Sequence, residues 1–170
     1  MAAKVTIVLI SVLLYVIGSA LFERLAPRRW VTAYQRATMP LYRPSAGLMP
    51  GWAVIETTGR KSGQPRQTPV GGRMRAHSFW LVTGERSRSQ YVKNLEAEPV
   101  VRVRIHGRWR VGTAHVLDDD NPRRRLLTMS PLNSLFVGIA GTDLATIRID
   151  LDTASMKPAA VQSSYSARPR

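Results

Sequence analysis

The sequence predicts a mainly β domain with a few helices, preceded by one long apolar helix near the N-terminus. Three short runs rich in Val, Thr and aromatic residues are typical of strands, and turn residues separate them: residues 52–57, 68–75 and 78–83. Links this short favour antiparallel pairing. We expect one domain, because 170 residues with 44% hydrophobic content bury a single core of ordinary size and show no internal repeat.

The clearest hairpin joins residues 101–105 to residues 109–111. With a three-residue loop, His106-Gly107-Arg108, its apolar side chains share one face and three arginines share the other: Arg102, Arg104 and Arg110. On the apolar face Trp109 and Val111 would join Val101, Val103 and Ile105. A two-residue His-Gly loop would set Val103 opposite Arg110 and mix the faces, so the hydrophobic pattern favours the longer loop.

Three further elements follow from local signals. Residues 87–98 are predicted to be a loop that runs into a short helix, capped by Ser87 or Ser89 and ending before Pro99. The acidic turn 118–122 is typical of a helix start and leads into residues 123–127, and residues 146–151 alternate as a last strand. Residues 154–170 are small, polar and basic without an apolar period, which predicts a disordered tail.

Residues 5–22 carry no charge and would be about 27 Å long as a helix at ~1.5 Å per residue, close to the ~30 Å of a bilayer core. We interpret residues 1–26 as a single membrane-spanning anchor of the inner or plasma membrane; a cleaved signal peptide is the alternative, for which Gly18-Ser19-Ala20 offers small residues. The cations after the run place the following domain in the cytoplasm. Residues 27–46 mix cations with aromatics and are interpreted as an interfacial helix and linker that Pro40 and Pro44 interrupt, before a folded, mainly β domain over residues 47–153.

The turn between the first two strands has the chemistry of an anion site. It contains Arg60, Lys61 and Arg66 with Ser62 between two glycines, and such side chains make charge-assisted bonds to phosphate or carboxylate oxygens. An ordinary cationic β-turn would use the same residue types. The start of the helix in residues 87–98 is a second candidate, since free N–H groups there point at a ligand beside Arg86 and Arg88; a solvated helix cap is its alternative.

Two segments carry a resemblance to a known family. The string from Gly59 to Pro69, Gly-Arg-Lys-Ser-Gly-Gln-Pro-Arg-Gln-Thr-Pro, resembles the opening motif of the deazaflavin-dependent nitroreductases and quinone reductases of actinobacteria. Residues 91–99 resemble that family's aromatic-x-x-Asn-Leu-x-x-x-Pro segment. The resemblance implies a split β-barrel of the FMN-binding type and reduced coenzyme F-420 as cofactor, with FMN as the alternative.

Carried onto this chain, the resemblance implies a set of cofactor-binding residues: Arg60, Lys61, Ser62, Arg66, Gly84, Arg86, Ser87, Tyr91 and Asn94. Two departures limit it. The loop at residues 84–88 is shorter and more charged than in relatives, and residues 130–136 lack the tyrosine that lines the family's substrate pocket. The catalytic residues and the substrate are therefore not assigned.

The sequence thus predicts a membrane-anchored, deazaflavin-dependent oxidoreductase that passes a hydride to a quinone-like, nitro or other lipophilic acceptor. A non-catalytic split-barrel subunit of a larger membrane complex is the alternative. The absence of cysteine excludes thiolate metal sites, and the three histidines are scattered, so no metal is expected. The formal charge of +14 favours anionic membrane lipid as a partner over nucleic acid, because no nucleic-acid-binding motif is present.

Overall fold

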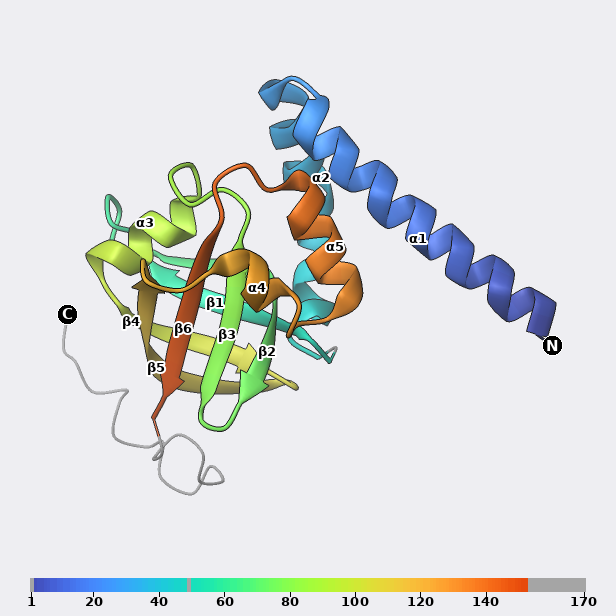
Figure 1. The fold of residues 1–170 in the computed structure, drawn as a ribbon. Coiled ribbons are helices and arrows are strands. Elements are labelled where there is room, and N and C mark those ends of the chain that lie inside the picture. Colours follow the sequence, from blue (N-terminus) through green and yellow to red (C-terminus); the bar gives the residue numbers. More distant parts are fainter. Residues whose placement is uncertain (1, 49, 153–170) are drawn as a thin grey trace.

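Six antiparallel strands close into a barrel in the computed structural model, which describes residues 2–48 and 50–152 (Figure 1). Around the barrel the strand order is β1-β2-β3-β6-β5-β4, so the last strand of the chain lies between β3 and β5. The strands are β1 (Trp52–Thr58), β2 (Pro65–Arg75), β3 (Ser78–Thr83), β4 (Val100–Ile105), β5 (Arg108–Leu117) and β6 (Ala145–Leu151). The predicted mainly β, split-barrel fold is confirmed.

The barrel interior is an apolar core built from alternate strand positions. In β1, Ala53 and Ile55 are fully buried and belong to the core, and in β4 the exposed Val100 and Arg102 alternate with the buried Val101 and Val103. Alternation of this kind turns one set of side chains inward and leaves the other at the surface. The core also receives residues from every other strand and from the helix between β3 and β4: Val70, Phe79, Leu81, Val92, Leu95, Val101, Val103, Ile105, Ala114, Ile147, Ile149 and Leu151.

The predicted loop of the β4–β5 hairpin is wrong. Ile105 pairs with Arg108, so the loop has two residues, and Val103 lies opposite Arg110. His106 and Gly107 have φ of 49° and 78°, the positive values that a two-residue type I′ turn requires.

The faces of this hairpin therefore differ from the prediction. Trp109 pairs with Arg104 and lies on the outer side, where Arg102 and Arg104 stack over its ring at 4.9 and 5.6 Å. These cation–π contacts stabilise an aromatic ring outside the core. The three arginines do not share one face, because Arg110 lies across from the buried Val103.

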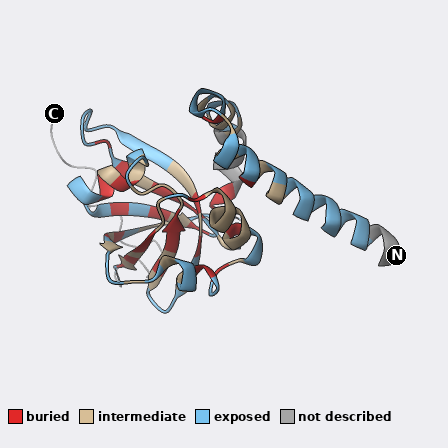
Figure 2. Ribbon diagram, turned by 45° about the horizontal axis from the view of Figure 1, so that its top comes forward, coloured by how far each residue is buried: buried red, intermediate tan, exposed pale blue. Residues whose placement is uncertain are grey.

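Two helices precede the barrel. The first, α1 (Ala2–Leu25), is apolar and largely exposed (Figure 2), and α2 (Arg28–Ala46) packs against β2 and β1. The expected interruption of α2 by its prolines is wrong, because the helix continues past both Pro40 and Pro44 to Ala46. A proline inside a helix removes one hydrogen bond and commonly bends the helix without ending it.

Three shorter helices complete the described chain: α3 (Gln90–Ala97), α4 (Pro122–Leu126) and α5 (Pro131–Ala140). The predicted helices at residues 87–98 and 123–127 are confirmed, with Ser89 and Asn121 at their N-cap positions. Helix α5 packs on α1 and approaches β2 so closely that a Cβ on Gly71 would overlap the Asn133 side chain. The tail predicted to be disordered, residues 154–170, lies outside the described residues.

Candidate functional site

The cationic turn is the hairpin connection between β1 and β2 and is held by its own backbone. Gly59 N donates to Gln64 O at 2.9 Å, and Gly63 N donates to Gly59 O at 2.7 Å with Gly63 at φ 65°. Ser62 N also donates to Gly59 O, and Ser62 Oγ accepts from Gln64 N. These N–H groups are used inside the turn, so the turn presents side-chain charge more than backbone donors to a ligand.

Arg60 fastens this turn to the start of α3. Its guanidinium donates to Asn94 Oδ1 at 3.2 Å and to Gln90 Oε1 at 3.0 Å, and its backbone N–H also reaches Asn94 Oδ1. Gln90 in turn donates to the carbonyl of Arg88. The two segments that the sequence singled out, the turn and residues 84–89, therefore meet at the N-terminus of α3.

Asn94 is the buried centre of this connection. It is 5% exposed, accepts from Arg60, and donates through Nδ2 to Oγ1 of the buried Thr57 at 3.1 Å. An amide has both a donor and an acceptor end, so a single side chain joins β1, the turn and α3. This geometry makes Asn94 a residue that positions Arg60.

Lys61 and Arg66 remain exposed at the same end of the barrel. Within the part of the chain that the structure describes, neither forms an ion pair, and the Arg66 stem lies over Gly59, where a Cβ would come within 3.5 Å of Arg66 Cγ. Glycine at position 59 is needed by the turn itself, because a Cβ there would come within 2.9 Å of Ser62 Oγ and 3.0 Å of Gln64 O. Two cations without carboxylate partners, held next to a rigid turn, form a place where an anionic group can bind.

The loop at residues 84–89 has a different electrostatic character. Arg86 forms a short hydrogen bond with Asp118 and a 3.5 Å ion pair with Glu96, and Asp118 raises the pKa of the Arg86 guanidinium above its ordinary value. Ser87 N donates to Asp143 Oδ2 at 2.8 Å, and hydrogen bonds from Ser87 lower the pKa of Asp143. The charge of Arg86 is thus largely neutralised by neighbouring carboxylates.

Gly84 and Tyr91 frame this loop. The carbonyl of Gly84 accepts from Thr142 N and Asp143 N, both at 3.0 Å, which ties the loop to the segment before β6. The Tyr91 ring packs on the barrel core, and burial raises the pKa of its hydroxyl to about 12, against a smaller opposing effect of the hydrogen bond with Thr83. Tyr91 is therefore neutral at physiological pH.

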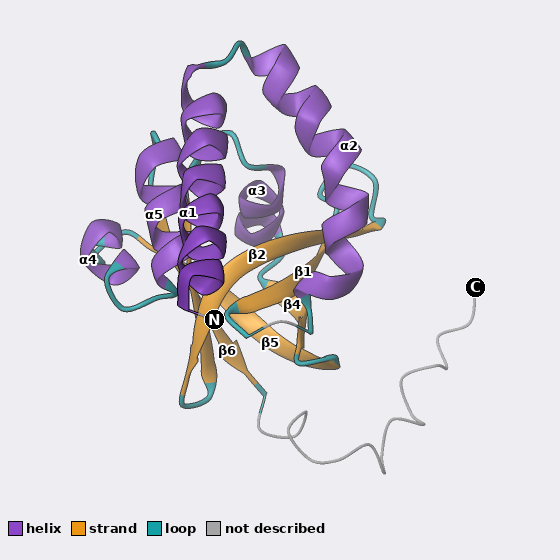
Figure 3. Cartoon of the chain, turned by 90° about the vertical axis from the view of Figure 1, so that its right-hand side faces the viewer, coloured by secondary structure: helices purple, strands orange, loops and turns teal. Residues whose placement is uncertain are grey.

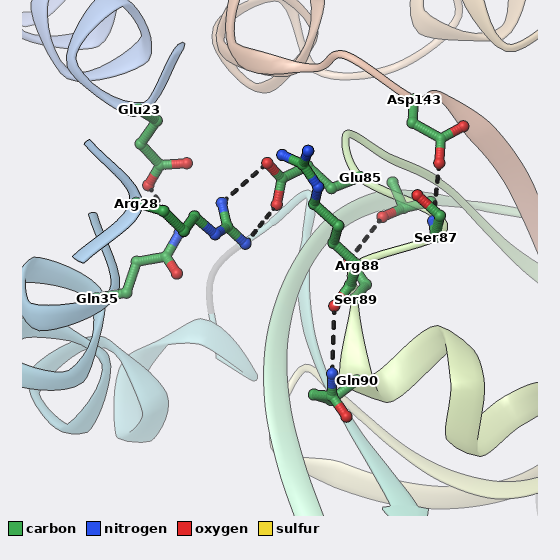
Figure 4. A network of polar contacts seen from close by, with 10 residues as sticks. Glu23, Arg28, Gln35, Glu85, Ser87, Arg88, Ser89, Gln90 and Asp143 are labelled. Atoms are coloured by element: carbon green, nitrogen blue, oxygen red, sulfur yellow. Dashed lines mark hydrogen bonds and ion pairs between the residues drawn. The ribbon is translucent and has the colours of Figure 1, made fainter. Parts of the chain in front are cut away.

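A second set of contacts on this loop has no local signal in the sequence. Arg28, the first residue of α2, makes a bidentate ion pair with Glu85, with N···O distances of 2.9 and 2.6 Å (Figure 4). Beside it Glu23 accepts from Gln35, which joins the end of α1 to α2. The N-terminal helices are therefore attached directly to the loop that the resemblance assigns to the cofactor.

Elsewhere on the surface, a shallow depression of about 480 Å³ lies between residues 119–123, which join the acidic turn to the start of α4, and residues 141–144. It is polar and open and lies apart from the cationic turn. Among the described residues no three His, Asp or Glu side chains are placed to hold a metal ion.

The fold and the site together define a split β-barrel whose cationic hairpin turn is hydrogen-bonded to the N-terminal part of α3. More narrowly, the chain belongs to the family described as "F420H(2)-dependent quinone reductase", whose family model matches residues 27–149. The resemblance stated from the sequence is confirmed.

Solved structures with a similar fold include an F420-H2 dependent reductase (FDR-A), with a TM-score of 0.47 and 17% identity over 58% of this chain and 93% of that chain. The general stress protein 26 of Bacillus anthracis is similar with a TM-score of 0.45 and 15% identity over 68% of this chain and 90% of that one. A pyridoxamine 5'-phosphate oxidase homologue from Listeria innocua has a TM-score of 0.46 and 14% identity over 60% and 84%. No curated protein matches the chain.

The residues of the cationic turn fit an anionic cofactor, whereas the arginine of the loop at residues 84–89 does not. Lys61 and Arg66 are exposed and available for phosphate or carboxylate groups. Arg86 is already paired with two carboxylates. The cationic turn is therefore the better candidate for the charged tail of a cofactor.

Proposed function

We propose that this protein is a membrane-anchored reductase that uses reduced coenzyme F-420 to reduce a quinone-like or other lipophilic acceptor. The observation that carries the proposal is the cationic turn, with Lys61 and Arg66 exposed beside an Arg60 that is fixed to α3, in a chain of this family. Carboxylate and phosphate groups are the ligands that such cations bind most strongly.

In this proposal Lys61 and Arg66 bind the phosphate and polyglutamate groups of the cofactor, and Arg60, Ser62 and Asn94 maintain the turn. The loop with Gly84, Arg86 and Ser87, together with Tyr91, lines the side on which the ring system lies. When bound, reduced F-420 would supply the hydride that, with one proton from solvent, converts a quinone acceptor into a quinol. The chain's own contribution is binding, orientation and the exclusion of water.

The anchor is the second part of the proposal. The described chain has one helix long and apolar enough to cross a bilayer, Val5–Leu25, and its position near the N-terminus would equally suit a signal sequence. We assign residues 1–26 to a single-pass anchor in the inner or plasma membrane, residues 27–46 to an interfacial linker and residues 47–153 to a barrel domain in the cytoplasm. A lipophilic acceptor dissolved in the bilayer would then be close to the domain.

The test of the activity uses the full chain in detergent with reduced F-420 and menadione, followed by the absorbance of the oxidised cofactor. Oxidation above the uncatalysed rate is expected, and a parallel titration with FMN distinguishes the two cofactors. Saturable F-420 binding without turnover of any quinone or nitro acceptor would contradict the reductase assignment and favour a non-catalytic subunit. Tight FMN binding with none for F-420 would overturn the choice of cofactor.

The anchor is tested separately by fractionation and protease protection in intact cells. The domain should remain with the membrane fraction and be inaccessible to a protease added outside. Release of a shortened chain into the soluble fraction would show that the N-terminal helix is cleaved as a signal sequence.

A further inference from the structure

Helix α5 is attached to the C-terminal half of α1. Figures 1 and 3 both show the two helices side by side, and Ala20 in this half of α1 is completely buried. Arg24 also donates from Nη1 to the carbonyl of Ile139, near the end of α5, at 2.9 Å. The depth at which α1 sits in a membrane therefore determines where α5 sits.

Only the N-terminal half of α1 is exposed on all sides. Residues 5–15 are uniformly exposed and project away from the barrel (Figure 2). As a helix they are about 16 Å long at ~1.5 Å per residue, roughly half of a ~30 Å hydrocarbon core. For the remaining half of α1 to enter the bilayer while docked, the helix packed beside it must also reach the lipid.

The chemistry of α5 suits such a position. Its residues, 131–140, carry no charge, and two leucines at its start face outward: Leu132 is 44% exposed, and Leu127 in the preceding turn is 86% exposed. Removing apolar surface from water is favourable by about 25 cal/mol per Å². While they are exposed to water, these leucines contribute none of this stabilisation. Contact with acyl chains would remove their surface from water and provide it.

Three cations flank the two leucines. Arg123 and Arg124 on α4 are exposed, and so is Arg73 on β2, which donates to the carbonyl of Thr128. An apolar patch rimmed by arginines matches the boundary between acyl chains and anionic headgroups. A second copy of the chain would bring identical cations against these, so charge complementarity favours lipid as the occupant.

We propose that the α5 face, which we define as α5 and Leu127 with the flanking arginines Arg73, Arg123 and Arg124, lies on the bilayer surface beside α1. The occupant is a membrane containing anionic phospholipid. This inference rests on the proposed membrane anchor. It makes the folded domain itself a membrane-contacting body, with Leu127 and Leu132 at the level of the upper acyl chains.

The chain contains no cysteine, so single-cysteine variants give a unique labelling site. We would place an environment-sensitive fluorophore at V8C on α1, at L127C and L132C on the α5 face, and at A97C on α3 as the control exposed elsewhere on the barrel. The full-length protein is reconstituted into vesicles of neutral and anionic phospholipid with nitroxide groups at shallow or deep positions of the acyl chain. Unchanged melting temperatures confirm that each variant is folded.

We expect nitroxides to quench probes at positions 8, 127 and 132 and not at 97, with shallow nitroxides more effective at 127 and 132. Quenching at position 8 alone would overturn the α5 face and leave the anchor intact. Absence of quenching at position 8 would remove the anchor on which both proposals rest. If the probe at position 127 is shielded from water but not quenched by lipid nitroxides, and the protein sediments as a dimer, the α5 face is covered by a second copy of the chain. That result would overturn the membrane as the occupant.

Discussion

The cationic turn at residues 59–66 and the loop at residues 84–89 are both rich in basic residues and both meet the start of α3, yet they present different charges. In the turn, Lys61 and Arg66 have no ion pair within the described chain. In the loop, Arg86 is matched by Asp118 and Glu96. The number of cations in a segment therefore does not tell how much positive charge is available to a ligand, because carboxylates from distant segments decide it.

The largest effect should come from the turn. Replacing both Lys61 and Arg66 with Ala should weaken cofactor binding about a hundredfold, since each charge-assisted contact contributes roughly tenfold when exposed and screened. Fluorescence titration with F-420 measures this. A matched control, R75A/R108A, removes the same charge from exposed positions elsewhere. Equal weakening in both double variants would mean that general electrostatic attraction, and no specific turn site, binds the cofactor.

The attachment of the turn to α3 should be visible in stability. Asn94→Ala leaves the buried Thr57 hydroxyl and the Arg60 donors without their partner, which costs about 1–3 kcal/mol. Urea unfolding measures the loss. Asn133→Ala is the control, because Asn133 is equally buried and its Nδ2 has no hydrogen bond among the described residues. Equal losses in the two variants would attribute the effect to volume alone.

Neutralising the carboxylate beside Arg86 should make the positive charge of the loop at residues 84–89 available to an anionic ligand, as the charge of the cationic turn is. Asp118→Asn removes the closer partner of Arg86 and should tighten cofactor binding by about threefold, as expected for a partly exposed pair. Glu98→Gln makes the same charge change at an exposed carboxylate that forms no ion pair with Arg86 and is the control. If both variants tighten binding equally, the effect comes from net charge and Arg86 is not part of the site.

The smallest effect concerns Tyr91 at alkaline pH. Its folded-state pKa of about 12 lies above the ~10 expected in the unfolded chain, so the neutral hydroxyl contributes stability that is present below pH ~10 and lost as the pH rises toward 12. Tyr91→Phe should lose less stability between pH ~10 and 12, which the midpoint of urea unfolding measures at steps of about 1 pH unit. Parallel curves for the two proteins would show that the hydroxyl is not desolvated.

Local patterns predicted most of the barrel. The strands at residues 52–57, 68–75, 78–83 and 146–151 were recognisable because β-branched and aromatic residues alternate between turn residues. The β4–β5 loop differs from the prediction because the geometry of a two-residue turn outweighs facial alternation here. His106 accepts a positive φ, and Trp109 has cation partners outside the core.

The candidate site was less predictable. The cationic turn is contiguous in sequence, so a local pattern identifies it. The residues that position or neutralise the arginines around the site lie far away in the sequence. Arg60 pairs with Gln90 and Asn94, Arg86 with Asp118, and Arg28 with Glu85. Contacts over such separations depend on how the strands are ordered, and no local pattern encodes them.

The position of β6 between β3 and β5 has a consequence for how the protein is made. Since Phe79 pairs with Ile149 and Ala114 also pairs with Ile149, the barrel cannot close until Leu151 has been synthesised. Until then β3 and β5 present open edges, which attract unwanted strand pairing. Helix α1 leaves the ribosome before the strands of the barrel. During synthesis this apolar helix is therefore exposed, and must insert into or pack against an apolar environment, while the domain that follows it is still unfolded.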